Sequence, residues 1–172
     1  MTLLIASGLL TLAFLSLFWM SPIGTPALKA IGNGRPSPDL TFGYRPDETY
    51  RLIESYGAGG IAHWRRLLLL DMIFPAVYGL FLSLLVDWCS RWAGEGLAWL
   101  TLATVFPVAS AGADYLENLA LLRVLAALPR RRDRLVSAAS FFTQIKFIAF
   151  FATLVSLVGF AGLKLFAMAG GH

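Results

Sequence analysis

Residues 97–128 form the apolar run LAWLTLATVFPVASAGADYLENLALLRVLAAL, in which the only charged residues are Asp114, Glu117 and Arg123. A helix rises about 1.5 Å per residue, so one of this length exceeds the roughly 30 Å of a bilayer hydrocarbon core. We therefore expect the run to cross a membrane, with a kink at Pro107, and its last turns to emerge from the hydrocarbon.

Two carboxyl groups and a carboxamide interrupt this run within one helical turn. Asp114, Glu117 and Asn118 stand at positions i, i+3 and i+4, which lie on one face of a helix. A charged residue at the bilayer centre costs about 2.5–3.5 kcal/mol on insertion scales. Ionisable residues inside membrane spans usually mark functional sites, so this face predicts one wall of a polar site.

The composition places the whole chain in the membrane class. Of 172 residues, 58% are hydrophobic and only 14% are charged. The net charge is +4, and the basic residues cluster beside hydrophobic segments. No nucleic-acid recognition motif accompanies them, so we expect no nucleic-acid partner. The single cysteine, Cys89, excludes an intrachain disulfide. With only two histidines, we expect neither a metal site nor a cofactor.

The apolar segments predict one integral membrane domain, residues 1–172, with an all-α fold of four transmembrane helices in a bundle. The spans are expected at about 3–20, 67–86, 97–122 and 140–166. The first is expected to be an uncleaved anchor, because no basic residue precedes it and no small-residue cleavage site follows. Residues 21–66 are expected to form a cytoplasmic loop and interfacial-helix cap between helices 1 and 2.

Within this cap, the prolines and glycines of residues 22–38 predict irregular loop. Residues 46–56 predict a short helix with Pro46 in its first turn and Gly57 as its end. Tyr50, Ile53 and Tyr56 recur near helical spacing, so we expect them to lie on the membrane surface, where the helix would cover the bundle.

Arginines predict the orientation. The short third loop contains four arginines, whereas the second loop, around residues 87–96, has only Arg91. By the positive-inside rule, the basic loops are expected in the cytoplasm and both termini outside it. The expected location is the bacterial inner membrane, with the termini in the periplasm. The basic residues expected at the membrane surface are Arg65, Arg66, Arg130, Arg131, Arg132 and Arg134. Binding of a substrate phosphate is the alternative role for the arginine-rich loop.

Depth in the membrane brings the polar residues of three helices together. Asp71 lies about 8 Å beyond Arg66 at 1.5 Å per residue, and Lys146 and Glu117 fall in the same half of their own spans. The expected ligand-binding or polar cluster is Asp71, Tyr78, Asp114, Glu117, Asn118, Thr143 and Lys146, with Arg123, Gln144 and Tyr115 as secondary members. Lys146 can neutralise one carboxylate and an inward-turned Arg123 a second, which leaves the third to hold a proton or a cationic ligand.

Two members of the cluster, and the nearby His63, also have a purely structural interpretation. Asp71 can extend toward Arg65 or Arg66 at the interface. Lys146 can form an ion pair that only fixes the helix register. His63, next to Trp64, is interpreted as a surface histidine rather than a ligand.

Three stretches resemble the signature positions of small, uncharacterised bacterial four-span membrane proteins. They are Asp71-Met72-Ile73-Phe74-Pro75-Ala76-Val77-Tyr78, Ala113-Asp114-Tyr115-Leu116-Glu117-Asn118 and Thr143-Gln144-Ile145-Lys146. The resemblance covers roughly residues 43–150 and implies that the acids, the asparagine and the lysine act as one unit. It implies Gly-Arg near the end of the cap, where this chain has Gly60-Ile61. The architecture is also distantly similar to the sterol-isomerase and sigma-2-receptor superfamily.

Three functions fit these observations. The first is a module that binds or transports a small amphiphilic or cationic molecule. The second is a structural or accessory subunit of a larger membrane complex. The third is a membrane enzyme on a lipid-like substrate, with Asp114 and Glu117 as acid/base and Lys146 and Asn118 stabilising charge. Expected partners are membrane lipid, the amphiphilic ligand, and another membrane protein or a second copy of the chain. No nucleophile motif, metal triad or nucleotide loop identifies catalytic residues.

Overall fold

The computed structural model describes residues 1–94 and 97–169, and nearly all of this part is helical. The elements are α1 (Thr2–Met20), α2 (Thr25–Ile31), the 3-10 helix η1 (Pro38–Leu40), α3 (Pro46–Asp71), α4 (Phe74–Ala93), α5 (Leu97–Ala127) and α6 (Asp133–Ala169). No strand occurs in the described ranges, so the all-α class predicted from the sequence is confirmed.

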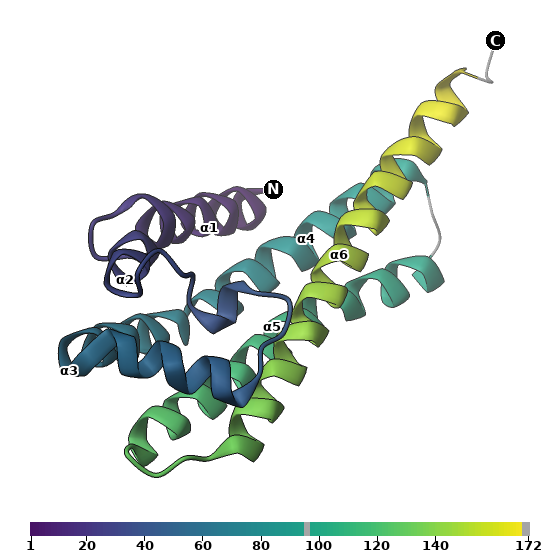
Figure 1. Cartoon of the computed structure of the whole chain (residues 1–172). Coiled ribbons are helices and arrows are strands. Elements are labelled where there is room, and N and C mark those ends of the chain that lie inside the picture. Colours follow the sequence, from purple (N-terminus) through teal and green to yellow (C-terminus); the bar gives the residue numbers. More distant parts are fainter. Residues whose placement is uncertain (95–96, 170–172) are drawn as a thin grey trace.

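The long helices α4, α5 and α6 pack side by side, as Figure 1 shows. α5 lies along both α6 and α4, and α1 packs mainly on α4. Gly79 allows the close approach of α4 to α5, because a Cβ there would stand only 2.9 Å from the side chain of Ala111. This contact fixes the spacing of the two helices beside Tyr78 and Asp114.

Three stretches are long and apolar enough to cross a membrane, judged by length and composition in the described ranges: Thr2–Ile31, Pro46–Ala93 and Asp133–Ala169. Large apolar side chains stay exposed along them, including Leu9, Leu12, Phe151 and Val158. Such a surface is unfavourable in water and suits lipid. These features fit the predicted membrane protein.

The second predicted span, residues 67–86, differs from the structure because the helix is interrupted inside it. α3 ends at Asp71 and α4 begins at Phe74. Pro75 has no N–H to donate to the carbonyl of Asp71, four residues earlier, so the helical ladder breaks there. α4 then continues to Ala93 through most of the segment predicted as the second loop, of which residues 95–96 lie outside the described part.

The segment between α1 and α3 is more ordered than predicted. Part of the stretch 22–38, predicted as irregular loop, forms α2, which has Pro26 in its first turn and the buried Leu28 on its inner face. The sequence predicts a short helix that begins at Pro46 and ends at Gly57. Gly57 does leave the helical conformation, with φ 58° and ψ −176°. A second helical stretch follows at once and reaches Asp71.

The expectation that Tyr50, Ile53 and Tyr56 lie on the membrane surface is wrong. Each is at most 5% exposed, and they pack in a core with Leu28 and Trp64. This core continues onto the adjoining ends of α5 and α6, so the segment is held against those helices by apolar burial.

Polar contacts also attach α3 to the turn between α5 and α6. The Arg132 backbone N–H donates to the Tyr50 hydroxyl, and Arg131 forms ion pairs with Asp47 and Asp133. The Arg131 guanidinium holds the pKa of Asp47 below its ordinary value. All six arginines predicted for the membrane surface have exposed side chains: Arg65, Arg66, Arg130, Arg131, Arg132 and Arg134.

Candidate functional site

The polar face of α5 points into the protein. Asp114 is 5% exposed, and Glu117 and Asn118 are fully buried. Ser110, one turn before Asp114, is also fully buried and extends the same face. Buried polar groups need hydrogen-bond partners, so the neighbours of these four residues define the site.

Lys146 of α6 provides the positive charge of the site. Its Nζ lies 2.6 Å from Glu117 Oε2 and 3.2 Å from Asp114 Oδ1. The third contact is a hydrogen bond of 3.2 Å to the backbone carbonyl of Asp39 in η1. An ammonium has three N–H donors, so these contacts use all of them, and Lys146 links α5, α6 and η1.

The other oxygen of Glu117 meets two hydroxyl groups. Thr143 Oγ1 lies 2.5 Å from Glu117 Oε1, and the Tyr44 hydroxyl donates to the same oxygen over 3.4 Å. Tyr44 belongs to the loop before α3, and burial followed by the charge of Glu117 raises the pKa of its hydroxyl well above the ordinary value. Tyr44 therefore keeps its proton and acts as a donor.

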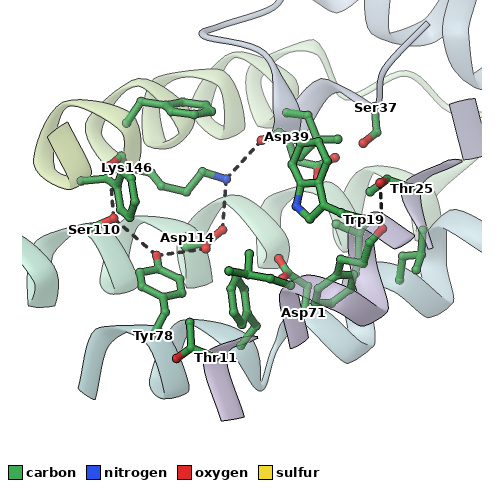
Figure 2. Close-up of a pocket in the computed structure, with 18 of the residues that line it drawn as sticks. Thr11, Trp19, Thr25, Ser37, Asp39, Asp71, Tyr78, Ser110, Asp114 and Lys146 are labelled. Carbon is green, nitrogen blue, oxygen red and sulfur yellow. Dashed lines mark hydrogen bonds and ion pairs between the residues drawn. The ribbon is translucent and has the colours of Figure 1, made fainter. Parts of the chain in front are cut away.

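The other oxygen of Asp114 accepts a hydrogen bond of 3.1 Å from the Tyr78 hydroxyl of α4. Ser110 lies 3.4 Å from that hydroxyl and itself donates to the backbone carbonyl of Lys146 over 3.1 Å. Figure 2 shows this chain of contacts from Lys146 through Asp114 and Tyr78 to Ser110. The acid is therefore fixed by groups from two further helices.

Asp71 is held by Asn118 at the break between α3 and α4. Asn118 Nδ2 donates to Asp71 Oδ2 over 2.8 Å and lies 3.4 Å from the Asp71 carbonyl that Pro75 leaves without its helical donor. Asp71 forms no ion pair with any described residue. The Asn118 amide thus provides a donor to the free carbonyl at the helix end. It also orients the Asp71 carboxylate, which has no cationic partner among the described residues.

A cavity of about 440 Å³ adjoins this cluster. Its polar end is formed by Asp39, Asp71, Tyr78, Ser110, Asp114 and Lys146. The remainder is mostly apolar and combines leucines with an aromatic wall formed chiefly by Phe18, Trp19, Phe74, Phe81, Phe147 and Phe150. Figure 2 shows Asp39, Asp114 and Lys146 converging on one side of this space and Asp71 on another. Glu117 does not line it, so that acid belongs to the packed network behind the cavity.

Comparisons of the chain with protein-family models, curated proteins and solved structures found no match. The functional interpretation therefore depends on the geometry of the chain's own residues.

The structure places the seven main residues of the predicted cluster in two hydrogen-bonded groups beside one cavity. The first group is Tyr78, Asp114, Lys146, Glu117 and Thr143, and the second is Asp71 with Asn118. The secondary members behave differently. Arg123 is exposed and does not turn inward to a carboxylate. Gln144 lies against Gly43, where an added Cβ would be 3.0 Å from its Nε2. Tyr115 is half-buried, and none of the contacts described above involves it.

Sequence reasoning missed Asp39, Tyr44 and Ser110. Ser110 carries a usable signal, because it stands four residues before Asp114 on the same helix face. Asp39 and Tyr44 lie in a connecting segment without helical periodicity, so no sequence pattern places them beside α6. Groups of three or more His, Cys, Asp or Glu side chains arranged to hold a metal ion do not occur among the described residues.

Proposed function

We propose that this protein is a four-span bacterial inner-membrane protein that binds or transports a small amphiphilic molecule with a cationic head. The head would occupy the polar end of the cavity and the apolar part would lie along its aromatic wall. The observation that carries this proposal is one cavity that joins a carboxylate-rich end to an extended apolar surface. Its volume falls within the range of about 300–1,000 Å³ typical of small-molecule sites.

The charges around the cavity favour a cationic head. Lys146 is already shared between Asp114 and Glu117. Asp39 and Asp71 both line the cavity, and within the described part neither carboxylate has an ion-pair partner. Asp39 Oδ1 is moreover buried without a hydrogen-bond partner in the described structure. Since a charge removed from water requires compensation, a ligand cation between these acids would satisfy both.

Membrane topology forms part of the proposal. α5 would be the fourth span, because it packs along both α4 and α6 and is itself largely apolar. Of the 14 lysines and arginines, all but Arg91, Lys146 and Lys164 fall between residues 29 and 66 or between 123 and 134. The positive-inside rule then makes α2, η1 and the first half of α3 a cytoplasmic cap, with both termini outside.

One observation favours a structural role instead. The network of Lys146, Glu117 and Thr143 is tightly paired and Glu117 is fully buried, as expected of a group that only fixes helix packing. A structural or accessory subunit is therefore the second candidate function. The two candidates differ in whether the carboxylates facing the cavity are needed for a ligand.

The test compares two twelve-carbon probes that differ in the head, dodecylamine and dodecanol, by native mass spectrometry of the protein in phosphatidylcholine nanodiscs. We expect wild-type protein to retain dodecylamine at least tenfold better than dodecanol. Asp71→Asn should lose about tenfold in amine affinity, or roughly 1.4 kcal/mol, because it removes the carboxylate charge while keeping the shape. Thermal stability should stay close to that of the wild type.

Asp87→Asn is the matched control, since Asp87 is an acid of α4 that pairs with Arg91 away from the cavity. It should leave amine retention unchanged. Equal retention of amine and alcohol by the wild type, or an Asp71→Asn variant that retains amine normally, contradicts the proposal. A large fall in stability without any change in amine affinity favours the structural candidate.

A further inference from the structure

We infer that the ligand enters the cavity sideways from the lipid, through an opening between α1 and α6, and that it is a single-chain amphiphile whose tail remains in this opening. This inference rests on the proposed function and adds the route of entry and the number of tails. It follows from which helices form the wall, which lining residues are exposed, and what covers the opposite end.

The wall of the cavity includes two helices that do not pack closely together. α1 contributes Leu15 and Trp19, and α6 contributes Phe147 and Phe150. α1 packs mainly on α4, whereas α6 packs on α5 and α4. In Figure 1, α1 lies clearly apart from α6 along its length. The cavity is therefore bounded by these two outer helices and by α4, whose Phe74, Tyr78 and Phe81 also line it.

Exposure identifies the mouth of the cavity. The large exposed side chains among its lining residues are Leu15, Trp19 and Phe150, at 38%, 58% and 39%. All three belong to α1 or α6 and are apolar. The neighbouring Leu12 and Phe151 are also exposed, at 61% and 67%. An apolar mouth within an apolar outer surface opens to hydrocarbon rather than to water.

The cap covers the opposite end. Asp39 lies there in η1, and its backbone carbonyl accepts a hydrogen bond from Lys146. Nearby, the Tyr44 backbone N–H donates to Ser140 Oγ over 2.9 Å. Two further lining residues on this side, Ser37 and Trp64, are buried at 4% and 1% exposure. A ligand arriving from the aqueous side would have to displace this segment, whereas one arriving from the lipid meets only the apolar mouth.

The same geometry limits the ligand to one tail. A polar head that reaches Asp71 and Asp39 must pass inward between α1 and α6, which leaves its tail between Trp19 and Phe150. The cavity, at about 440 Å³, lies toward the small end of ligand sites. A head with one alkyl chain fits this arrangement, and the bulk of a two-chain phospholipid exceeds it.

The experiment measures exchange of bound dodecylamine. Protein in phosphatidylcholine nanodiscs is loaded with deuterated dodecylamine and chased with the unlabelled amine, and native mass spectrometry follows the bound label over time. Leu15→Trp and Phe150→Trp enlarge side chains at the mouth. We expect each to slow exchange at least tenfold, with a smaller change in equilibrium occupancy, because the acids that hold the head are unaltered.

Leu9→Trp and Val158→Trp are matched controls, since both residues are exposed on the same two helices and neither lines the cavity. They should exchange at the wild-type rate. For wild-type protein the rate should follow the amine-to-lipid ratio rather than the aqueous amine concentration. Wild-type exchange rates in both mouth variants, or a rate set by the aqueous concentration, overturn lateral entry.

The two proposals fail in distinguishable ways. If lateral entry alone is wrong, Asp71→Asn still loses amine affinity while the mouth variants exchange normally. If the wild type does not bind dodecylamine at all, the proposed function fails and the route fails with it. Equal exchange of a two-chain cationic lipid contradicts the single-chain requirement alone.

Discussion

Thr143 and Thr153 both point inward from α6 and are fully buried, yet their hydroxyl groups have different partners. Thr143 Oγ1 contacts Glu117, whereas Thr153 Oγ1, among the described residues, donates only to the Ala149 carbonyl of its own helix. The same residue type at the same burial is thus part of the site in one case and not in the other. At this scale, the partner determines the role of a side chain.

We expect Thr143→Val to destabilise the protein by about 1–3 kcal/mol, because it removes a donor from a buried carboxylate. Thr153→Val should cost less than about 1 kcal/mol, since the Ala149 carbonyl keeps its backbone partner. Reversible unfolding in mixed micelles measures both values. Equal losses in the two variants would show that the contact with Glu117 contributes no particular stability.

At the scale of elements, two interruptions position the site. Pro75 separates α3 from α4 and leaves Asp71 at a helix end, where Asn118 meets both its carboxylate and its carbonyl. Gly57 redirects α3 between the part that begins at Pro46 and the part that reaches Asp71. Both breaks have a local cause that the sequence contains.

Gly57→Ala should destabilise the fold by about 1–3 kcal/mol, because φ 58° with ψ −176° lies in a region that only glycine adopts readily. No atom stands within 4 Å of an added Cβ, so this loss would come from the backbone rather than a clash. Gly59→Ala is the control: this helical glycine is also in open space, and the change should stabilise by up to about 1 kcal/mol. A neutral Gly57→Ala would mean that α3 can continue without the break.

For the whole molecule, the arrangement of helices determines where the cavity lies. α4, α5 and α6 form the packed part, α1 lies against α4, and the segment from α2 to the first half of α3 covers one end. In the proposed topology the exposed apolar surfaces of α1 and α6 face lipid, and the arginine-rich turn lies beside the covered end.

The proposed topology predicts that alkaline phosphatase fused after His172 is active in bacterial cells, whereas green fluorescent protein fused there does not fluoresce. In a Cys89→Ser background, Arg132→Cys should react with an impermeant maleimide in inverted vesicles and not in intact cells. The physical reason is the clustering of basic residues on one side. A fluorescent C-terminal fusion would contradict four spans with both termini outside.

Local chemistry explains how much the sequence predicted. The helical class, the shared face of Asp114, Glu117 and Asn118, and the break at Gly57 depend on residues within a turn or two of one another. The burial of Tyr50 was not predicted, because an amphipathic helix can place its apolar face on lipid or on protein equally well. Only packing against α2, α5 and α6 decided that this face lies on protein rather than on lipid.

The sequence by itself determined that the chain is helical and that one face of α5 carries two acids and an amide, because helical periodicity fixes the neighbours of a residue within its own segment. Only the tertiary structure decided that Asp39 and Tyr44 join the site, that Arg123 stays outside it, and that a cavity opens beside Asp71. Those outcomes depend on contacts between distant segments, which are set by how apolar surfaces bury one another across the whole chain.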